Sequence, residues 1–429
     1  MSTNKSWGNN PKVKDQKNIN YSKELLFDDL SYLPIGLGRS YGDVGLNENG
    51  TTISMTNHNE IISLDEKNGI LNCESGLSIK DILSLIVPKG WFLPVVPGTR
   101  NVTIGGAIAN DIHGKNHHKV GTFGNYVKSI RLLRSDGTIL NCNEKENRDF
   151  LSATVGGLGL TGIIISAEIY LKKISSTYVD VTTIKFQSLD EYWEINNKFE
   201  KEFDYTVSWV DCIYNQNKSL RGVYLAGNHK ENFERKKYFE NINITFPFTP
   251  PFSLINNFSL KVLNQLYYSL NKTSKNSVQH YKKFFFPLDV VNNWNKAYGK
   301  KGFFQYQFVV PKKNGRQAIQ KVLEVININN QIPALGVLKN FGDIKSTGLN
   351  SFPFEGVTLS LDFPNKGDKT KKLFEELNKV IFENNGRIYP AKDAFMNPKE
   401  FEDSYEGLNN FIKYIDPKFS SSFWRRVNK

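Results

Sequence analysis

WFLPVVPGTRNVTIGGAIANDIHGKNHHKVGTFG, residues 91–124, is the stretch of this sequence that decides the fold. Pro97 and Gly98 predict a turn. Thr103 is a typical helix N-cap, so a short helix of small residues is expected from Thr103 to Asn110. The free N–H groups at a helix N-terminus suit a phosphate, and residues with almost no side chain let a flat cofactor approach closely. On its own, the Gly-Gly-Ala cluster fits a close helix-sheet contact equally well.

A second glycine-rich turn, GLGRSYGD (residues 36–43), favours the ligand-binding interpretation. It follows the apolar residues 33–35 and precedes a strand-like run at 51–55. It is not a dinucleotide-binding fingerprint, because the third glycine is misplaced and no βαβ unit with an acidic residue about 20 positions on follows it. It also lacks the lysine pattern of a Walker motif. Two separate phosphate-sized loops in one domain predict a pyrophosphate cofactor held by both.

The composition is that of an ordinary globular protein. With 429 residues, 39% of them hydrophobic and 13% aromatic, the chain can bury the cores of two or three domains. It has no run of about 18 apolar residues, and its first residues are polar and lack the apolar core of a signal peptide. Cys73, Cys142 and Cys212 show neither disulfide nor metal spacing, which is typical of a reducing compartment. We therefore expect a cytoplasmic protein whose residues before about Tyr21 are disordered or loosely docked.

The net charge of +12 raises the question of nucleic-acid binding. The basic clusters, such as 235–237 and 369–372, lie beside acidic residues, and no nucleic-acid-binding motif occurs. The charge therefore argues against a nucleic-acid partner. It suits an anionic bilayer or a phosphate-bearing substrate, and a peripheral contact with the inner face of a membrane is expected.

Strands and helices alternate in the first part of the chain. Asn68-Gly69 and Asp136-Gly137 predict two hairpins, and Ser78 is expected to cap a helix over residues 79–87. A helix is expected at 147–153 and an apolar strand at 160–171. This order predicts an α+β domain.

From about Ser175 the pattern changes to longer aromatic strands, at 178–186, 205–214, 221–226, 303–311, 332–338 and 357–363. Helices are expected at 189–203, 316–327 and 371–384, the last ended by Asn385-Gly386. Residues 241–283 combine prolines, aromatics and a polar tract without a clear period. We expect this segment to be a mobile lid or a lipid-facing flap, and a plain helical excursion is equally compatible with its sequence.

Four motifs, GLGRSYGD, PGTRNVTIGGAIANDIHGKNHH, GTFGNYV and VGGLGLTGII, resemble the FAD-binding domain of the vanillyl-alcohol-oxidase (PCMH-type) flavoenzymes. Within that superfamily the sequence is most similar to the decaprenylphosphoryl-β-D-ribose 2'-oxidase family. The likeness continues in FPLDVVNNWNKAYGKKGFFQYQFVVP (286–311), LKNFG (338–342), LDFP (361–364) and GRIYPAKD (386–393). It implies a PCMH-type FAD-binding domain at 1–176, an antiparallel-sheet substrate domain at 177–386, and a C-terminal return to the FAD domain at 387–429.

The resemblance also assigns site residues. Those expected to bind FAD are Gly36, Leu37, Gly38, Arg39, Ser40, Tyr41, Gly42, Asp43, Gly98, Thr103, Ile104, Gly105, Gly106, Asn110, Asp111, Ile112, His113, Gly114, Ile164 and Tyr389. Those expected to take part in catalysis are Lys392, His113, Tyr41 and Lys115. Those expected to bind the substrate are Tyr298, Gln305, Gln307, Lys339, Phe341, Thr358 and Ser360.

Several of these assignments have a physical basis in the sequence. Gln305 and Gln307 lie two apart in a strand and so share one face, where amides suit a polyol. A lysine such as Lys392 that enters a dry cleft has a lowered pKa and can accept a proton. The alternatives are an exposed polar strand face and a surface lysine. Taken alone, His113 fits a hydrogen-bonded structural histidine better than a functional one. Zinc binding by His113, His117 and His118 is not expected, because no carboxylate pair or cysteine completes a ligand set.

Two positions depart from the family pattern. Some members have an Asn-x-Cys pair where this chain has Thr358 and Ser360, so the substrate pocket differs. Some relatives attach FAD through a histidine in the first glycine-rich loop, where this chain has Arg39. We therefore expect non-covalent FAD.

The resemblance implies FAD-dependent oxidation of a secondary hydroxyl of a polyprenyl-phosphate-linked pentose, such as decaprenylphosphoryl ribose, to a keto sugar. This would be the first half of an epimerisation in cell-envelope polysaccharide synthesis, and a separate NAD(P)H-dependent keto-reductase would complete it. The first alternative is an oxidase of a soluble alditol or aldonolactone. The second is a non-catalytic binding module that keeps the flavin fold. The sequence leaves open the pentose, the lipid carrier, the electron acceptor and the oligomeric state.

Overall fold

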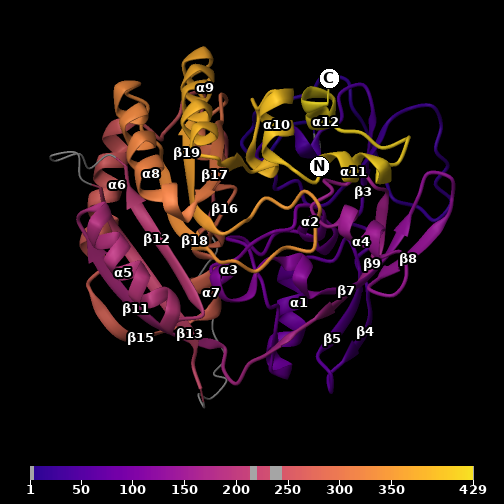
Figure 1. Ribbon diagram of the computed structural model, residues 1–429, viewed down its shortest axis with the longest axis horizontal. Coiled ribbons are helices and arrows are strands. Elements are labelled where there is room, and N and C mark those ends of the chain that lie inside the picture. Colours follow the sequence, from indigo (N-terminus) through magenta and orange to yellow (C-terminus); the bar gives the residue numbers. More distant parts are fainter. Residues whose placement is uncertain (1–3, 213–219, 232–243, 429) are drawn as a thin grey trace.

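The computed structural model describes residues 4–212, 220–231 and 244–428. Its two halves lie side by side in Figure 1. One half is built from the first 175 residues and carries the C-terminal helices, and the other is built around one large sheet. The mixture of helices with parallel and antiparallel strands confirms the α+β class.

The first half contains two larger sheets besides the two-stranded pair of β6 (Trp91–Phe92) and β10 (Lys172–Lys173). A three-stranded parallel sheet has the order β1 (Lys17–Asn20), β3 (Thr51–Ser54), β2 (Tyr32–Ile35). An antiparallel sheet has the order β4 (Ile61–Asp65), β5 (Ile70–Glu74), β9 (Ile163–Tyr170), β7 (Val127–Leu133), β8 (Ile139–Asn143). Both predicted hairpins are present, as β4–β5 and β7–β8. Gly69 and Gly137 have positive φ angles of 65° and 86°, which explains glycine at both turns.

The helices of this half begin at the predicted caps. The Ser78 hydroxyl accepts a hydrogen bond from Asp81 N, and helix α1 (Ile79–Ile86) buries Ile79, Ile82, Leu83 and Ile86. Thr103 caps α2 (Ile104–Ala109) in the same way. The other elements of this half are η1 (Asp43–Gly45), η2 (Val87–Lys89), β6 (Trp91–Phe92), α3 (His117–Val120), η3 (Phe123–Tyr126), α4 (Arg148–Thr154) and β10 (Lys172–Lys173).

The second half is organised around an eight-stranded antiparallel sheet. Its order is β15 (Ser274–His280), β11 (Tyr178–Phe186), β13 (Arg221–His229), β12 (Tyr205–Asp211), β18 (Leu335–Phe341), β19 (Gly356–Pro364), β17 (Phe303–Pro311), β20 (Arg387–Ile388). Tyr306 on β17 packs on Phe374 and donates to Asn378, so this face of the strand carries the helices. Gln305 and Gln307 alternate with it and therefore face the first half.

Helices and short elements complete this half. Helices α5 (Leu189–Glu202), α8 (Lys312–Ile328) and α9 (Asp368–Glu383) contribute to one large core with the sheet. The remaining elements are β14 (Ile244–Thr245), α6 (Asn257–Leu270), α7 (Tyr281–Phe285), η4 (Pro287–Val290), β16 (Val291–Asn292) and η5 (Trp294–Tyr298).

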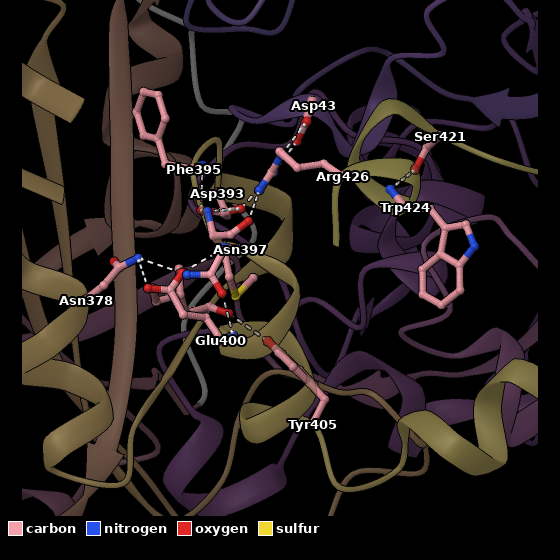
Figure 2. A network of polar contacts seen from close by, with 12 residues as sticks. Asp43, Asn378, Asp393, Phe395, Asn397, Glu400, Tyr405, Ser421, Trp424 and Arg426 are labelled. Atoms are coloured by element: carbon pink, nitrogen blue, oxygen red, sulfur yellow. Dashed lines mark hydrogen bonds and ion pairs between the residues drawn. The ribbon is translucent and has the colours of Figure 1, made fainter. Parts of the chain in front are cut away.

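After β20 the chain runs over the first half, where α10 (Pro398–Ser404), α11 (Leu408–Phe411) and α12 (Ser422–Val427) appear in yellow in Figure 1. The short helices η6 (Pro390–Lys392) and η7 (Ile412–Tyr414) complete this segment. Tyr32 N donates to Lys418 O, and the Arg426 guanidinium binds both Asp43 and Asp393 (Figure 2). Glu400 joins this region to α9 by accepting from Asn378, as the same view shows. The limits 1–176, 177–386 and 387–429 stay our proposed domain boundaries.

Two expectations need correction. The residues before Tyr21 are not loosely docked from residue 4 onward, because β1 pairs with β3, Trp7 N donates to Ser40 O, and Phe303 N donates to Gly8 O. The described part of the segment 241–283 contains α6 and the edge strand β15, which agrees with the helical alternative and not with an irregular flap. Its first three residues, 241–243, lie outside the described residues, and its mobility stays a prediction.

Candidate active site

A cavity of about 820 Å³ lies between the two halves. Its walls come from the loop after β2, from α2, from β17 and β18 of the large sheet, and from the turn that carries Lys392. This volume is in the range of cofactor and substrate sites. The two glycine-rich loops predicted to bind one ligand therefore do open on one space.

The two loops touch each other at Gly36. A Cβ placed on Gly36 would collide with the Thr103 side chain, whose hydroxyl accepts from Gly106 N at 3.2 Å. Gly38 has a φ of 63°, and a Cβ there would meet nothing within 4 Å. Gly105 and Gly106 keep the adjacent wall flat. The arrangement fits a pyrophosphate and a ring system that lie against backbone.

His113 is held on both ring nitrogens. Lys339 Nζ lies 2.9 Å from Nδ1, and the Gln307 amide lies 3.2 Å from Nε2. Burial and the nearby lysine charges hold the pKa of His113 well below its usual value. A neutral imidazole has one donating and one accepting nitrogen, so only one of these two nitrogen groups, Lys339 Nζ or the Gln307 amide nitrogen, can donate to His113. The Phe341 ring, 4.8 Å away centre to centre, fixes the imidazole from the side.

A second cluster surrounds Lys392. Its Nζ lies 3.3 Å from Ser360 Oγ and above the rings of Tyr41 and Tyr389, at 5.8 and 6.0 Å from their centres. Burial lowers the pKa of Lys392 to about 8, and the carboxylate of Asp362 opposes that shift. Burial raises the pKa of Asp362 to about 6. The amine can therefore exchange a proton near neutral pH, as a general base must.

Gln305 connects Asp362 of this cluster to Tyr41. Its amide donates to Asp362 Oδ1, and it also hydrogen bonds to Tyr41. Burial raises the pKa of the Tyr41 phenol, which therefore stays protonated. Asp362 was not among the expected site residues, and it holds Gln305 from behind.

Most of the expected residues reach the cavity. Those on its wall are Gly36, Leu37, Gly38, Arg39, Ser40, Tyr41, Gly42, Gly98, Thr103, Gly105, Gly106, Asn110, Ile112, His113, Ile164, Gln305, Gln307, Lys339, Ser360, Tyr389 and Lys392. Those behind it are Asp43, Ile104, Asp111, Gly114, Lys115, Tyr298, Phe341 and Thr358. The functional roles of all of them stay predictions.

The residues behind the wall support those on it. Thr358 Oγ1 accepts from Gln307 at 3.0 Å, and Tyr298 stacks on Phe303 at 4.1 Å between ring centres. Asp111 accepts from Gly124 N and from the hydroxyls of Ser346 and Ser351. These contacts fix side chains and loops around the cavity.

Lys115 lies among aromatic rings rather than on the cavity wall. Its Nζ donates to Phe285 O at 3.1 Å and lies 5.5 Å from the centre of the Phe284 ring. Burial lowers the pKa of Lys115 to about 8. The amine thus adds a partial positive charge beside Lys339, and its catalytic assignment stays a prediction.

The neighbouring histidines have other partners. His117 Nδ1 accepts from Gly342 N, and His118 Nε2 lies 2.9 Å from Phe203 O. Across the ranges that the structure describes, no group of three or more His, Cys, Asp and Glu side chains is placed to hold a metal ion.

Sequence reasoning missed the N-terminal wall of the cavity. The Arg39 guanidinium lies over the Trp7 ring at 3.9 Å, and Lys5, Ser6 and Asn9 line the same space. Asp289 was also missed; it accepts from Thr99 Oγ1 and Arg100 N and so ties η4 to the Pro97-Gly98 loop. A tryptophan isolated in a polar segment was the available signal for Trp7.

Comparison with known proteins identifies the family. Residues 21–143 match the model of an FAD-binding domain. The chain is 35% identical over 407 residues to the decaprenylphosphoryl-β-D-ribose oxidase of Mycolicibacterium smegmatis, an alignment that covers 91% of this chain and 88% of that protein. The chain belongs to the decaprenylphosphoryl-β-D-ribose oxidase family. It is an FAD-dependent oxidoreductase.

Two further relatives show how far the likeness extends. An uncharacterized protein in the mprA 5' region of Streptomyces coelicolor is 24% identical over 371 residues, or 82% of this chain and 100% of that protein. The Delta(24)-sterol reductase of Mus musculus is 29% identical over 136 residues, or 32% of this chain and 26% of that protein. The decaprenylphosphoryl-β-D-ribose oxidase family thus shares both halves of the chain, whereas the sterol reductase shares a limited part.

Proposed function

We propose that this chain oxidises a secondary hydroxyl of a polyprenyl-phosphate-linked pentose to a keto sugar. The M. smegmatis relative is named for decaprenylphosphoryl ribose. The observation that carries the proposal is the buried Lys392 amine, which shares one cavity with the paired amides of Gln305 and Gln307. A proton acceptor beside donors and acceptors for a polyol is what alcohol oxidation requires.

FAD, when bound, would accept the hydride from the sugar carbon. The Lys392 amine, once neutral, takes the hydroxyl proton, and Ser360 holds its Nζ in place. Gln305 and Gln307 orient the sugar hydroxyls because Asp362 and Thr358 fix their amides. Burial of these groups excludes water and strengthens every hydrogen bond to the substrate.

Anaerobic mixing of the FAD-loaded protein with a polyprenylphosphoryl pentose tests the proposal. The flavin absorbance should bleach with the lipid-linked sugar and persist with free alditols and aldonolactones. Bleaching by the free sugars alone would select the soluble-sugar oxidase instead. A protein that binds FAD and bleaches with none of these compounds would be a binding module.

A separate NAD(P)H-dependent keto-reductase would convert the keto product to the epimeric sugar. We place the reaction in the cytoplasm at the inner face of the membrane, because Cys73, Cys142 and Cys212 are all free thiols and the proposed substrate carries a lipid. Of the helices in the described ranges, none has both the length and the apolar character that crossing a bilayer demands. Peripheral contact is therefore the form of membrane association that we propose.

A further inference from the structure

Helix α6 has its apolar side turned outward. Phe258 is 78% exposed and Leu270 is 72% exposed, and Val262, Leu263 and Leu266 are each more than half exposed. These residues recur at intervals of three and four and so form one continuous stripe. A surface helix of a globular protein normally buries such a stripe, so α6 is inverted.

The inward side of α6 buries Leu260 and is otherwise held by polar contacts. Asn264 is buried and donates to Asp211 Oδ1 at 2.7 Å, and Gln265 accepts from Arg221 at 2.9 Å. Asp211 and Arg221 in turn form a buried ion pair at 2.7 Å. Directional contacts to the ends of β12 and β13 therefore fix the helix in this orientation.

The exposed apolar surface continues from α6 to the cavity. Leu254 N donates to Ala297 O and Lys300 N donates to Pro250 O, so residues 244–254 lie along residues 291–300. Phe248 and Phe252 are about two-thirds exposed on this strip, while Thr245, Thr249 and Leu288 line the cavity. On the other side, Tyr267 of α6 contacts Trp209, which is paired with the cavity residue Val337.

The segment of sequence that carries this surface is rich in lysine. Residues 244–301 contain eight lysines and a single acidic residue, Asp289, although the whole chain has 43 acidic residues. The Asp289 carboxylate is turned inward onto Thr99 and Arg100. Lysines beside exposed aromatic and aliphatic side chains are the combination that binds an anionic bilayer, since headgroups attract the ammonium groups and the acyl region takes the apolar ones.

We propose that α6 and residues 244–254 form a membrane-docking surface that seats the cavity mouth on an anionic bilayer. We call these two segments the docking surface. An extended prenyl chain would then stay in the lipid while its sugar phosphate enters the cavity. This consequence for substrate delivery rests on the proposed function, whereas the docking itself does not.

Vesicle flotation of the FAD-loaded protein tests the docking surface. Binding is expected to vesicles that contain phosphatidylglycerol, and to weaken with salt or with pure phosphatidylcholine. A Phe258→Ser, Leu270→Ser variant should lose about tenfold or more in vesicle affinity, because two large apolar side chains no longer enter the lipid. The matched control is Leu26→Ser, Ile328→Ser, which removes two side chains that are 86% and 82% exposed elsewhere.

Charge reversal at Lys261 and Lys272 supplies a second variant. It should weaken binding to the anionic vesicles and leave FAD content and thermal stability unchanged, as expected for substitutions at exposed sites. Failure to float, equal binding to phosphatidylcholine, or an equal loss in the control variant would overturn the proposal. So would sedimentation showing a dimer that Phe258→Ser, Leu270→Ser dissociates, because a second copy would then cover the helix.

The two proposals fail separately in this design, because flotation is measured without substrate. Vesicle binding by a protein that leaves every polyprenylphosphoryl pentose unoxidised would refute the proposed function alone. Oxidation of a detergent-dispersed lipid-linked sugar by a protein that does not bind vesicles would refute the docking surface alone.

Discussion

Replacing Arg426 with methionine should destabilise the FAD-loaded protein by about 3–5 kcal/mol, the usual cost of removing one partner from a buried ion pair. The guanidinium contacts Asp43 at 2.6 and 2.9 Å and Asp393 at 2.8 Å (Figure 2). The side chains of Asp43 and Asp393 are only 11% and 4% exposed. Methionine keeps much of the length and removes the charge, so two carboxylates remain buried without a cation.

The contacts of Arg426 join two parts of the site that lie far apart in the sequence. Asp43 ends the first glycine-rich loop, and Asp393 follows Lys392 directly. A Cβ on Gly42 would collide with Asp393 O, so the two segments also touch through backbone. The Arg426→Met protein should therefore lose FAD more readily and turn over more slowly, besides unfolding earlier.

The pH dependence of the loss has a definite sign. Burial already raises the pKa of Asp43, and Arg426 opposes that rise. Without the guanidinium the carboxyl pKa rises further, so the folded state binds more protons than the unfolded state. The variant's stability must then fall as pH rises, and its deficit relative to the wild type should be larger at pH 8 than at pH 5.

Urea unfolding in saturating FAD, followed by circular dichroism at both pH values, measures these differences. Lys371→Met is the matched control, since Lys371 and Glu375 form an ion pair with both side chains more than half exposed, and its loss should cost less than about 0.5 kcal/mol. Adding Asp43→Asn to Arg426→Met should recover part of the stability. A loss no larger than that of the control, or one independent of pH, would refute the reasoning.

Three further predictions concern the cavity. Turnover should rise with pH through about 8 as the Lys392 amine becomes neutral. Lys392→Met should lower kcat by about 10²–10⁴ and abolish this rise in the pH profile. An unchanged pH profile of the variant in stopped-flow assays would show that Lys392 is not the base. Thr103→Ala should cost about 1 kcal/mol of stability and weaken FAD binding, because Gly106 N loses its hydrogen-bond acceptor. Thermal shift and flavin fluorescence measure the two effects, and Thr103→Ser should restore both stability and FAD binding. Acid precipitation should leave all flavin in the supernatant, since Arg39 stands where some relatives attach FAD; yellow colour in the pellet would contradict this.

Local patterns predicted much of the fold. The strand pattern of β17 predicted a strand from Phe303 to Pro311, which are its observed limits. The Asn68-Gly69 turn predicted the position of the β4–β5 hairpin. In these cases the information lies in neighbouring residues, through strand periodicity and turn chemistry. The Thr103 cap was predictable for the same reason.

The elements that escaped prediction depend on partners far away in the chain. Trp7 is ordered by Arg39 and by Ser40 O, neither of which a polar N-terminal segment reveals. Helix α6 was only one of two alternatives for its segment, because its apolar stripe faces outward and its inward side, apart from Leu260, is held by Asp211 and Arg221. Asp362 acts through Gln305, a contact that exists only once β17 and β19 pair.

The electrostatics of the cavity connect these features. The amines of Lys115, Lys339 and Lys392 are all desolvated, and the pKa of each is lowered, so placing Lys115 and Lys392 near Lys339 costs stability. Asp362 alone among the described residues acts on Lys392 as an opposing charge. An anionic ligand would supply the missing counter-charge, raise these pKa values and recover part of that stability. A phosphate-bearing substrate that enters from a bilayer surface would supply this counter-charge and would also account for the outward apolar stripe of α6. A neutral, water-soluble sugar would account for neither feature.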